Sequence, residues 1–368
     1  MIAFEPTEEQ ELIRDTVREF AESEIRELER PADEAEEVQE EFLEKSWELG
    51  LVNSAIPEPL GGGGFERSPI TNTIVLEELA AGSVSLAVSA MAPSLFINPL
   101  LDFGTEEQQA EYLPLFTGES YHAASLALHE ESFVFDATNL STVAESKGEG
   151  FSLTGSKRFV PMGDRASHFL VVARSGAREG LADLEAFIVP SDAKGVSVER
   201  EKMLGLRGAP FARLDLDHVE VPKAGRLGGQ SGIDGRRLVN SSRVASAALC
   251  VGLSRAVMEI SIPYAKDRVA FGEPIARKQA IAFMLAEMQI EVNSMRHLVW
   301  KAASQLEQGL DATKATQLAQ VYMKRETMKI ADNGLQIFGG HGYIRDYPLE
   351  MWYRNARTVT VLESAAAV

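Results

Sequence analysis

The sequence predicts an α+β fold in which a helical segment, a block of short strands and a second helical segment follow one another. In the first third of the chain, apolar residues recur at steps of three and four, which is the period of an amphipathic helix. From about residue 123 short apolar segments alternate with turn residues, and from about residue 236 helical spacing returns. We therefore expect an N-terminal all-α domain over 1–122, a middle β domain over 123–223 and a C-terminal helical bundle over 224–368.

In the first domain, two capping boxes predict where helices begin. Thr7 with Gln10, and Thr105 with Gln108, have the spacing at which a Thr hydroxyl and a Gln side chain satisfy backbone N–H groups reciprocally. Helical spacing also covers the apolar residues between 42 and 49 and between 75 and 86. The glycines from Gly61 to Gly64 predict a flexible connector between those two helices.

The middle block predicts a small antiparallel sheet or barrel. Its apolar segments are bounded by Gly, Asp, Ser and Pro, and they lie at 151–155, 168–173, 186–189, 196–198 and 214–216. The last third predicts long helices instead, over 242–270, 274–308 and 312–338.

Composition excludes several classes of protein. A net charge of -19 and a pI near 4.9 argue against nucleic acid as a partner. One Cys cannot form a disulfide framework, and the six His have no metal-ligand spacing, so we expect no metal site. The sequence has no run of about 18 apolar residues and no signal-peptide layout at its N-terminus. We therefore expect a cytoplasmic protein without a membrane span.

Four features near the C-terminal end could carry chemistry. The glycines after helices, in 268–272 and 336–343, would let backbone N–H groups approach a phosphate or a ring, although a plain helix cap has the same pattern. The arginines of 354–357 could pair with phosphates. Glu363 stands between Leu362 and Ser364-Ala365-Ala366, and a carboxylate buried in such apolar surroundings would be suited to take a proton from carbon.

Spaced motifs along nearly the whole chain resemble the acyl-CoA dehydrogenases. They are Gly104-Thr-Glu-Glu-Gln108, Gly155-Ser-Lys-Arg-Phe159, Met203-Leu-Gly-Leu-Arg207, Arg268-x-x-Phe271-Gly272, Gln336-Ile-Phe-Gly-Gly-His-Gly-Tyr343 and Arg354-Asn-Ala-Arg357. The resemblance extends from about residue 4 to residue 363 and keeps the order of these motifs.

This resemblance implies a FAD enzyme that removes a proton and a hydride from adjacent carbons of an acyl-CoA to give a trans-2-enoyl-CoA. The hydride would pass to flavin N5 and the electrons to an electron-transfer flavoprotein, within a homotetramer built as a dimer of dimers. One branch of the family keeps its base at the position of Glu363. The other branch keeps it at the position of Ser242, so Glu363 remains the candidate base.

The resemblance also implies binding residues. Asn240 and Arg243 match positions that line the CoA pantetheine and the base. The residues that match cofactor-binding positions are His129, Phe159, Val160, Pro161, Arg268, Phe271, Gln279, Gln336, Gly339 and Gly340.

The chain departs from the family pattern at the flavin loop. The segment from His129 to Asp136 keeps only Glu130 and Asp136, and Pro161 stands where the family has a hydroxyl that bonds the flavin. His129 could donate to the flavin or could mark a site under relaxed constraint. Two alternatives therefore stay open: a divergent acyl-CoA flavoenzyme of the oxidase or β-elimination type, and a flavin-poor subunit of a hetero-oligomer.

Overall fold

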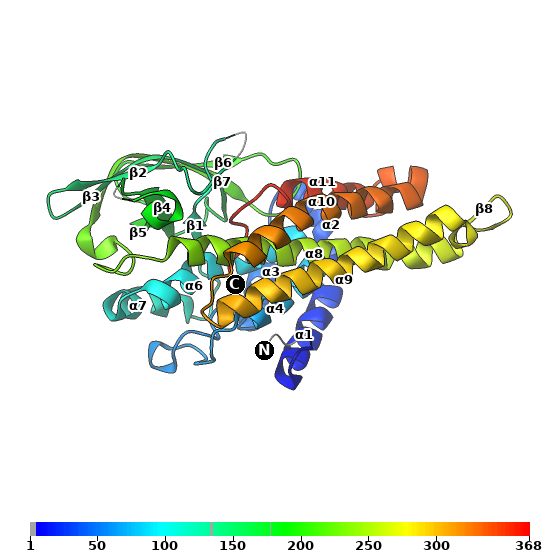
Figure 1. The fold of residues 1–368 in the computed structure, drawn as a ribbon, viewed down its shortest axis with the longest axis horizontal. Helices are drawn as coiled ribbons and strands as arrows, with labels where there is room; N and C mark the ends of the chain where they lie inside the picture. The colour runs from blue at the N-terminus through cyan, green and yellow to red at the C-terminus, as the bar shows by residue number, and fades with distance from the viewer. Residues whose placement is uncertain (1–4, 133–134, 177) are drawn as a thin grey trace.

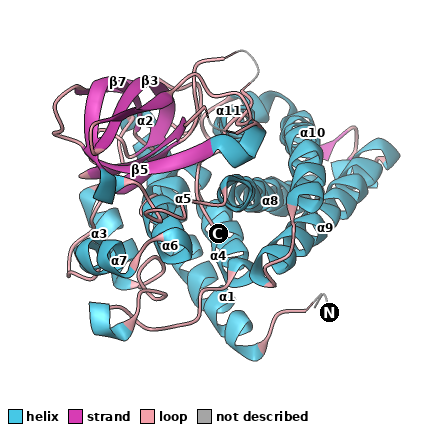
Figure 2. Ribbon diagram, turned by 60° about the vertical axis from the view of Figure 1, so that its left-hand side comes forward, coloured by secondary structure: helices cyan, strands magenta, loops and turns pink. Residues whose placement is uncertain are grey.

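Helices from both ends of the chain pack together on one side of a curled sheet formed by the middle of the chain (Figures 1 and 2). The computed structural model describes residues 5–132, 135–176 and 178–368. The long helices run side by side along the longest axis, and the sheet lies at one end of them (Figure 1). The predicted α+β class, with helices before and after a β block, is confirmed. The domain boundaries at 122/123 and 223/224 stay predictions.

The N-terminal part is helical, as predicted. Both capping boxes form: Thr7 Oγ1 accepts from the N–H of Gln10 at 3.2 Å, and Thr105 Oγ1 accepts from the N–H of Gln108 at 3.3 Å. A π-helical turn, Ala21–Ile25, joins the first two helices and was not predicted. The helices are α1 (Glu8–Phe20), α2 (Arg26–Ala35), α3 (Glu40–Glu48), α4 (Pro69–Gly82), α5 (Val84–Met91), α6 (Ser94–Phe103) and α7 (Glu106–Tyr112).

The sheet is mixed, so the expected antiparallel pairing holds for most of its strand pairs but not for all. Its strands are β1 (Ala124–Ala127), β2 (Val143–Lys147), β3 (Gly150–Pro161), β4 (His168–Arg174), β5 (Leu184–Pro190), β6 (Val196–Glu201) and β7 (Phe211–Pro222). They follow the order β1-β4-β2-β3-β7-β6, with β5 beside β4, and β4 is parallel to both β1 and β2. The sequence did not predict β1, because all four of its residues are buried and give no alternation.

The C-terminal helices begin and end at other residues than predicted. Helix α8 (Gly235–Asp267) starts seven residues earlier than predicted, since Asp234 Oδ1 accepts from the N–H groups of Arg236 and Arg237. Pro274 does not open a helix. It lies in a hairpin of two short strands, β8 (Val269–Ala270) and β9 (Glu273–Pro274). The remaining helices are α9 (Gln279–Glu307), α10 (Thr313–Phe338) and α11 (Leu349–Val359), of which α11 was not predicted.

Two helical stretches of the described chain are long and apolar enough to cross a membrane, Pro69–Met91 and Gly235–Asp267. The expectation of no such stretch rested on strictly apolar runs, whereas mean hydropathy tolerates scattered polar residues. Their most apolar windows are 100% and 83% buried inside the protein. Core helices of globular proteins have the same length and composition, so this finding is weak evidence for a membrane span.

Helix α11 is anchored to α2 before the chain reaches Glu363. Arg354 pairs with Asp33 at 2.8 Å and with Glu350 on its own helix at 3.0 Å. The indole N–H of Trp352 donates to Glu29 at 2.8 Å. The Arg354 guanidinium, expected to pair with a phosphate, is therefore used to hold the helix that precedes the candidate base.

The loop after β1 is tied to β3 by a buried ion pair. Lys157 Nζ lies 2.7 Å from Glu130 Oε1, and the Lys157 side chain is fully buried. The Glu130 carboxylate also accepts from Ser141 and Thr142. Burial alone would raise the pKa of Glu130, but the Lys157 ammonium and these hydrogen bonds lower it well below its usual range. The pair holds the segment that begins at His129.

Replacing Lys157 by Met should leave a buried carboxylate without its counterion. We expect the free energy of unfolding to fall by about 3–5 kcal/mol in the Lys157→Met variant. Urea unfolding checks this value, and the double variant Lys157→Met/Glu130→Gln should recover most of the loss. A loss below about 1 kcal/mol would show that this pair does not hold the loop.

Glu29 gives the fold a pH dependence. Burial raises the pKa of Glu29 to about 7, although the hydrogen bond from Trp352 acts in the opposite direction. Because the folded state then holds a proton that the unfolded state has lost, stability falls as the pH rises from about 4.5 to about 7. In Glu29→Gln this decrease, about 3 kcal/mol, should disappear. Urea unfolding of both proteins at about pH 5 and about pH 8 measures the difference, and parallel pH profiles would contradict it.

Candidate functional site

The Glu363 carboxylate is buried between α8 and α10. Its Oε2 lies 2.6 Å from Arg243 Nε, and its Oε1 accepts from Gln320 Nε2 at 2.5 Å. Lys324 Nζ also lies 3.3 Å from Oε1. Glu363 is only 4% exposed. The apolar surroundings expected from the flanking sequence were therefore wrong, because helices distant in the sequence bring polar groups to the carboxylate.

The turn of α8 that carries Arg243 has unused hydrogen-bonding groups. Asn240 is buried and its Nδ2 donates to Thr313 Oγ1 at 3.2 Å, while its Oδ1 has no partner among the described residues. Ser242 is fully buried, and its hydroxyl also has no partner there. Buried polar atoms are normally satisfied, so this turn has capacity for a bound ligand close to Glu363.

His129 lies on the side of the site that faces the sheet. Its ring stacks on Phe135 with centroids 4.2 Å apart and meets Phe159 edge-on at 5.1 Å. Burial lowers the pKa of His129 to about 4, although the nearby negative charge of Glu363 acts in the opposite direction. His129 is therefore neutral at pH 7, and its Nδ1 has no partner among the described residues. Phe133 and Val134, in the same loop, lie outside the described residues.

The three predicted residues of β3 do not all face this site. Phe159 has a φ of 54°, at a register shift between β3 and β7, and contacts His129. Val160 is buried in the core of the sheet, and Pro161 pairs with Phe211. Phe159 is thus the residue of the three that the structure brings next to His129.

The other predicted cofactor residues lie at the far end of the long helices, around the hairpin β8–β9 (Figure 1). Arg268, Gln279 and Gln336 are exposed there, and Phe271 is 95% exposed. Gly339 and Gly340 follow α10, and a side chain at either position would meet nothing within 4 Å. The end of α8 contacts the end of α10, because Tyr264 stacks on Phe338 and its hydroxyl bonds His341. Within one chain, however, this set is remote from Glu363.

Gln320 and Lys324 were not predicted from the sequence. Both lie on α10, one turn apart, and both reach Glu363 Oε1. No motif identifies them, since polar residues four apart on a helix normally lie on a solvated face. Only the packing of α10 against α8 brings them to the carboxylate.

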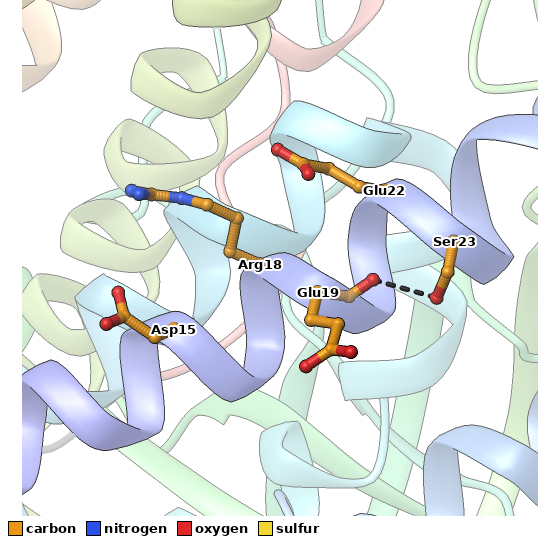
Figure 3. A pocket seen from close by; sticks show the side chains of 5 residues that line it. All are labelled: Asp15, Arg18, Glu19, Glu22 and Ser23. Carbon is orange, nitrogen blue, oxygen red and sulfur yellow. Dashed lines mark hydrogen bonds between the residues drawn. The ribbon is translucent and has the colours of Figure 1, made fainter.

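The cavities of the described chain that adjoin α1 do not form this site. One, of about 540 Å³, is an open groove along α1 and the π-turn, lined by Asp15, Arg18, Glu19, Glu22 and Ser23 (Figure 3). Its mostly acidic walls do not suit an apolar ligand.

A neighbouring cavity of about 260 Å³ lies where arginines from α1, α8 and α9 meet Glu77 and Glu78. These carboxylates accept from Arg18, Arg255 and Arg296. We interpret this network as structural, because both carboxylates accept hydrogen bonds from arginines of other helices. Among the described residues there is also no cluster of His, Cys, Asp and Glu that could hold a metal ion.

Three family models match successive parts of the chain. They are the acyl-CoA dehydrogenase N-terminal domain over residues 7–119, the middle domain over 125–219 and the C-terminal domain over 235–366.

Two relatives and one solved structure cover almost the whole chain. An acyl-CoA dehydrogenase of Bacillus subtilis is 35% identical over 97% of this chain and 94% of its own. The caffeyl-CoA reductase-Etf complex subunit CarC of Acetobacterium woodii is 34% identical over 98% and 96%. The structure of butyryl-CoA dehydrogenase from Megasphaera elsdenii superposes with a TM-score of 0.88 at 27% identity, over 98% of this chain and 96% of that one. The chain belongs to the acyl-CoA dehydrogenase family.

Proposed function

We propose that the protein is a FAD-dependent acyl-CoA dehydrogenase of the cytoplasm. It would convert an acyl-CoA thioester to the trans-2-enoyl-CoA, with Glu363 as the base that takes the α-proton. The observation that carries this proposal is a buried carboxylate beside Arg243, in a family whose relatives act on CoA thioesters. The acyl group itself is left open.

The geometry suits Glu363 to proton transfer in two respects. The carboxylate is held in one orientation by donors on both of its oxygens, and accurate positioning of a base contributes as much as its strength. Helix α11, which leads to Glu363, is fixed to α2 through Arg354 and Trp352. An α-carbon presented to Glu363 would therefore meet a base whose place is set by three helices.

The chain's residues fit FAD as two separate sets. His129, with an unpartnered Nδ1, and Phe159 offer a polar atom and a ring face beside Glu363. Arg268, Gln279, Gln336, Gly339 and Gly340 offer a cation, amides and open backbone, as a pyrophosphate requires. When bound, FAD would supply the acceptor for two electrons.

The distance between the two sets supports a homo-oligomer. Arg243 marks the first set, because it pairs with Glu363, and Arg268 belongs to the second. The two arginines are 25 positions apart on one helix and its C-cap, about 37 Å along the axis, which is longer than an extended FAD. A single FAD beside Glu363 would therefore take the second set from another copy of the chain. This reasoning agrees with a homotetramer, and a hetero-oligomer in which a different subunit supplies that set is the alternative.

An electron-transfer flavoprotein is the proposed acceptor of the electrons. The support is that one relative, 34% identical to this chain, is a subunit of a complex with such a flavoprotein.

Replacing Glu363 by Gln should remove the base and keep the shape of the side chain. We expect exchange of the α-hydrogens of butyryl-CoA in heavy water to slow at least about 100-fold in Glu363→Gln, since a positioned base contributes factors of that size. Mass spectrometry of the CoA ester measures exchange without requiring hydride transfer, and other acyl-CoAs extend the panel.

Glu326→Gln is the matched control, because Glu326 is another buried glutamate, on α10, and it pairs with Arg325 instead of with the groups around Glu363. It should exchange at the wild-type rate. Equal exchange by wild type and Glu363→Gln would contradict the assignment of the base.

Replacing Arg268 by Ala should weaken cofactor retention if the second set binds FAD. We expect the ratio of flavin to protein absorbance after gel filtration to fall several-fold in Arg268→Ala. Arg236→Ala is the control, because Arg236 is an exposed arginine at the other end of the same helix. Full flavin content in Arg268→Ala would contradict the proposed role of that set.

A further inference from the structure

We propose that Lys324 is a positioning residue for Glu363, whose ammonium stabilises the carboxylate from its Oε1 side and holds it in one orientation. This inference rests on the proposed function only in so far as the orientation of Glu363 serves proton transfer. The ion pair itself is a property of the folded chain.

The two oxygens of Glu363 are held by different helices. Oε2 is bound by Arg243 on α8, at 2.6 Å from Nε. Among the described residues, Oε1 is bound from α10 alone, by Gln320 at 2.5 Å and by Lys324 at 3.3 Å. Because Gln320 and Lys324 are one turn apart, they approach Oε1 from the same face of α10. Loss of either donor would leave Oε1 with one partner, while Oε2 stays bound to Arg243.

Lys324 differs from Arg243 in its exposure. The side chain of Arg243 is 12% exposed and that of Lys324 is 41% exposed, whereas that of Glu363 is 5% exposed. Lys324 therefore extends from solvent to a buried carboxylate, and its ammonium is the more hydrated of the two cations. Its positive charge also reaches inward as far as Cys250 on α8, where it acts against the burial that raises the pKa of that thiol.

The other titratable groups around the carboxylate come from different elements. His129 faces Glu363 from the loop after β1, and Asp136 in the same loop faces Arg243. None of these groups is changed by a substitution at Lys324, so a difference between wild type and variant reports Lys324 alone.

A nearby cation stabilises the ionised form of a carboxylic acid. Replacing Lys324 by Met keeps the length and the apolar part of the side chain and removes the charge. Glu363 should then ionise at higher pH, and at low pH a larger fraction should be protonated and unable to accept a proton. At high pH the carboxylate is ionised in both proteins, so the rate of α-hydrogen exchange should fall only at low pH. A merely structural defect would lower that rate at low and at high pH alike.

The test is an infrared titration of the purified protein. The C=O stretch of protonated Glu363 is the carboxylic band that Glu363→Gln abolishes. We expect Lys324→Met to raise the pH of its midpoint, with a two- to fivefold change in the ionisation constant, the range for a partly exposed pair. Lys324→Arg should restore the wild-type midpoint.

Lys329→Met is the matched control. Lys329 lies on the same helix, its side chain is 48% exposed, and it forms an ion pair of the same length, 3.3 Å, with Glu287. It should leave the midpoint unchanged. An unshifted midpoint in Lys324→Met, or an equal shift in Lys329→Met, would overturn the proposal.

This readout separates the present inference from the proposed function, since it needs no substrate. If the midpoint shifts but Glu363→Gln exchanges α-hydrogens normally, the positioning by Lys324 stands and the assignment of Glu363 as the base fails. If exchange depends on Glu363 and the midpoint does not shift, the positioning role of Lys324 fails and the assignment of the base stands.

Discussion

The ion pair between Arg243 and Glu363 is the contact on which the rest of the candidate site depends. It joins α8, the 33-residue helix that packs against α4, α9 and α10, to the segment that follows α11. A buried carboxylate without partners would cost several kcal/mol, of the order of 3–5, so Glu363 can stay inside only where α8 and α10 supply donors. The packing of these two helices therefore determines where the candidate base lies.

Local rules in the sequence were enough to predict the elements that depend on local interactions. The capping boxes at Thr7 and Thr105 were predicted correctly, because their hydrogen bonds span only three residues. Helix α11 was missed because it is held by contacts with α2 more than 300 positions away, such as that between Arg354 and Asp33. The hairpin at Phe271 and Gly272 was missed as well. Its two residues at φ of 55° and 84° form a tight turn that Pro274 made look like the start of a helix.

The candidate site shows the same division between what local sequence indicates and what tertiary packing decides. Glu363 and Arg243 were identified through motifs of a known family, and the structure brings them together. Gln320 and Lys324 belong to no motif and reach Glu363 only because α10 crosses beside α8. The polar surroundings of Glu363 could not be derived from neighbours such as Leu362, since the groups that contact its carboxylate are 39 to 120 positions away.

We propose that this chain oxidises an acyl-CoA with bound flavin, and that Glu363 takes the α-proton. The most direct measurement is the visible absorption spectrum of the purified protein, recorded without oxygen before and after addition of a panel of acyl-CoAs. We expect a flavin absorption band that corresponds to about one flavin per chain and that bleaches when one of the acyl-CoAs is added. A colourless protein that takes up no added FAD would contradict the account, and the flavin-poor subunit would then be the better description.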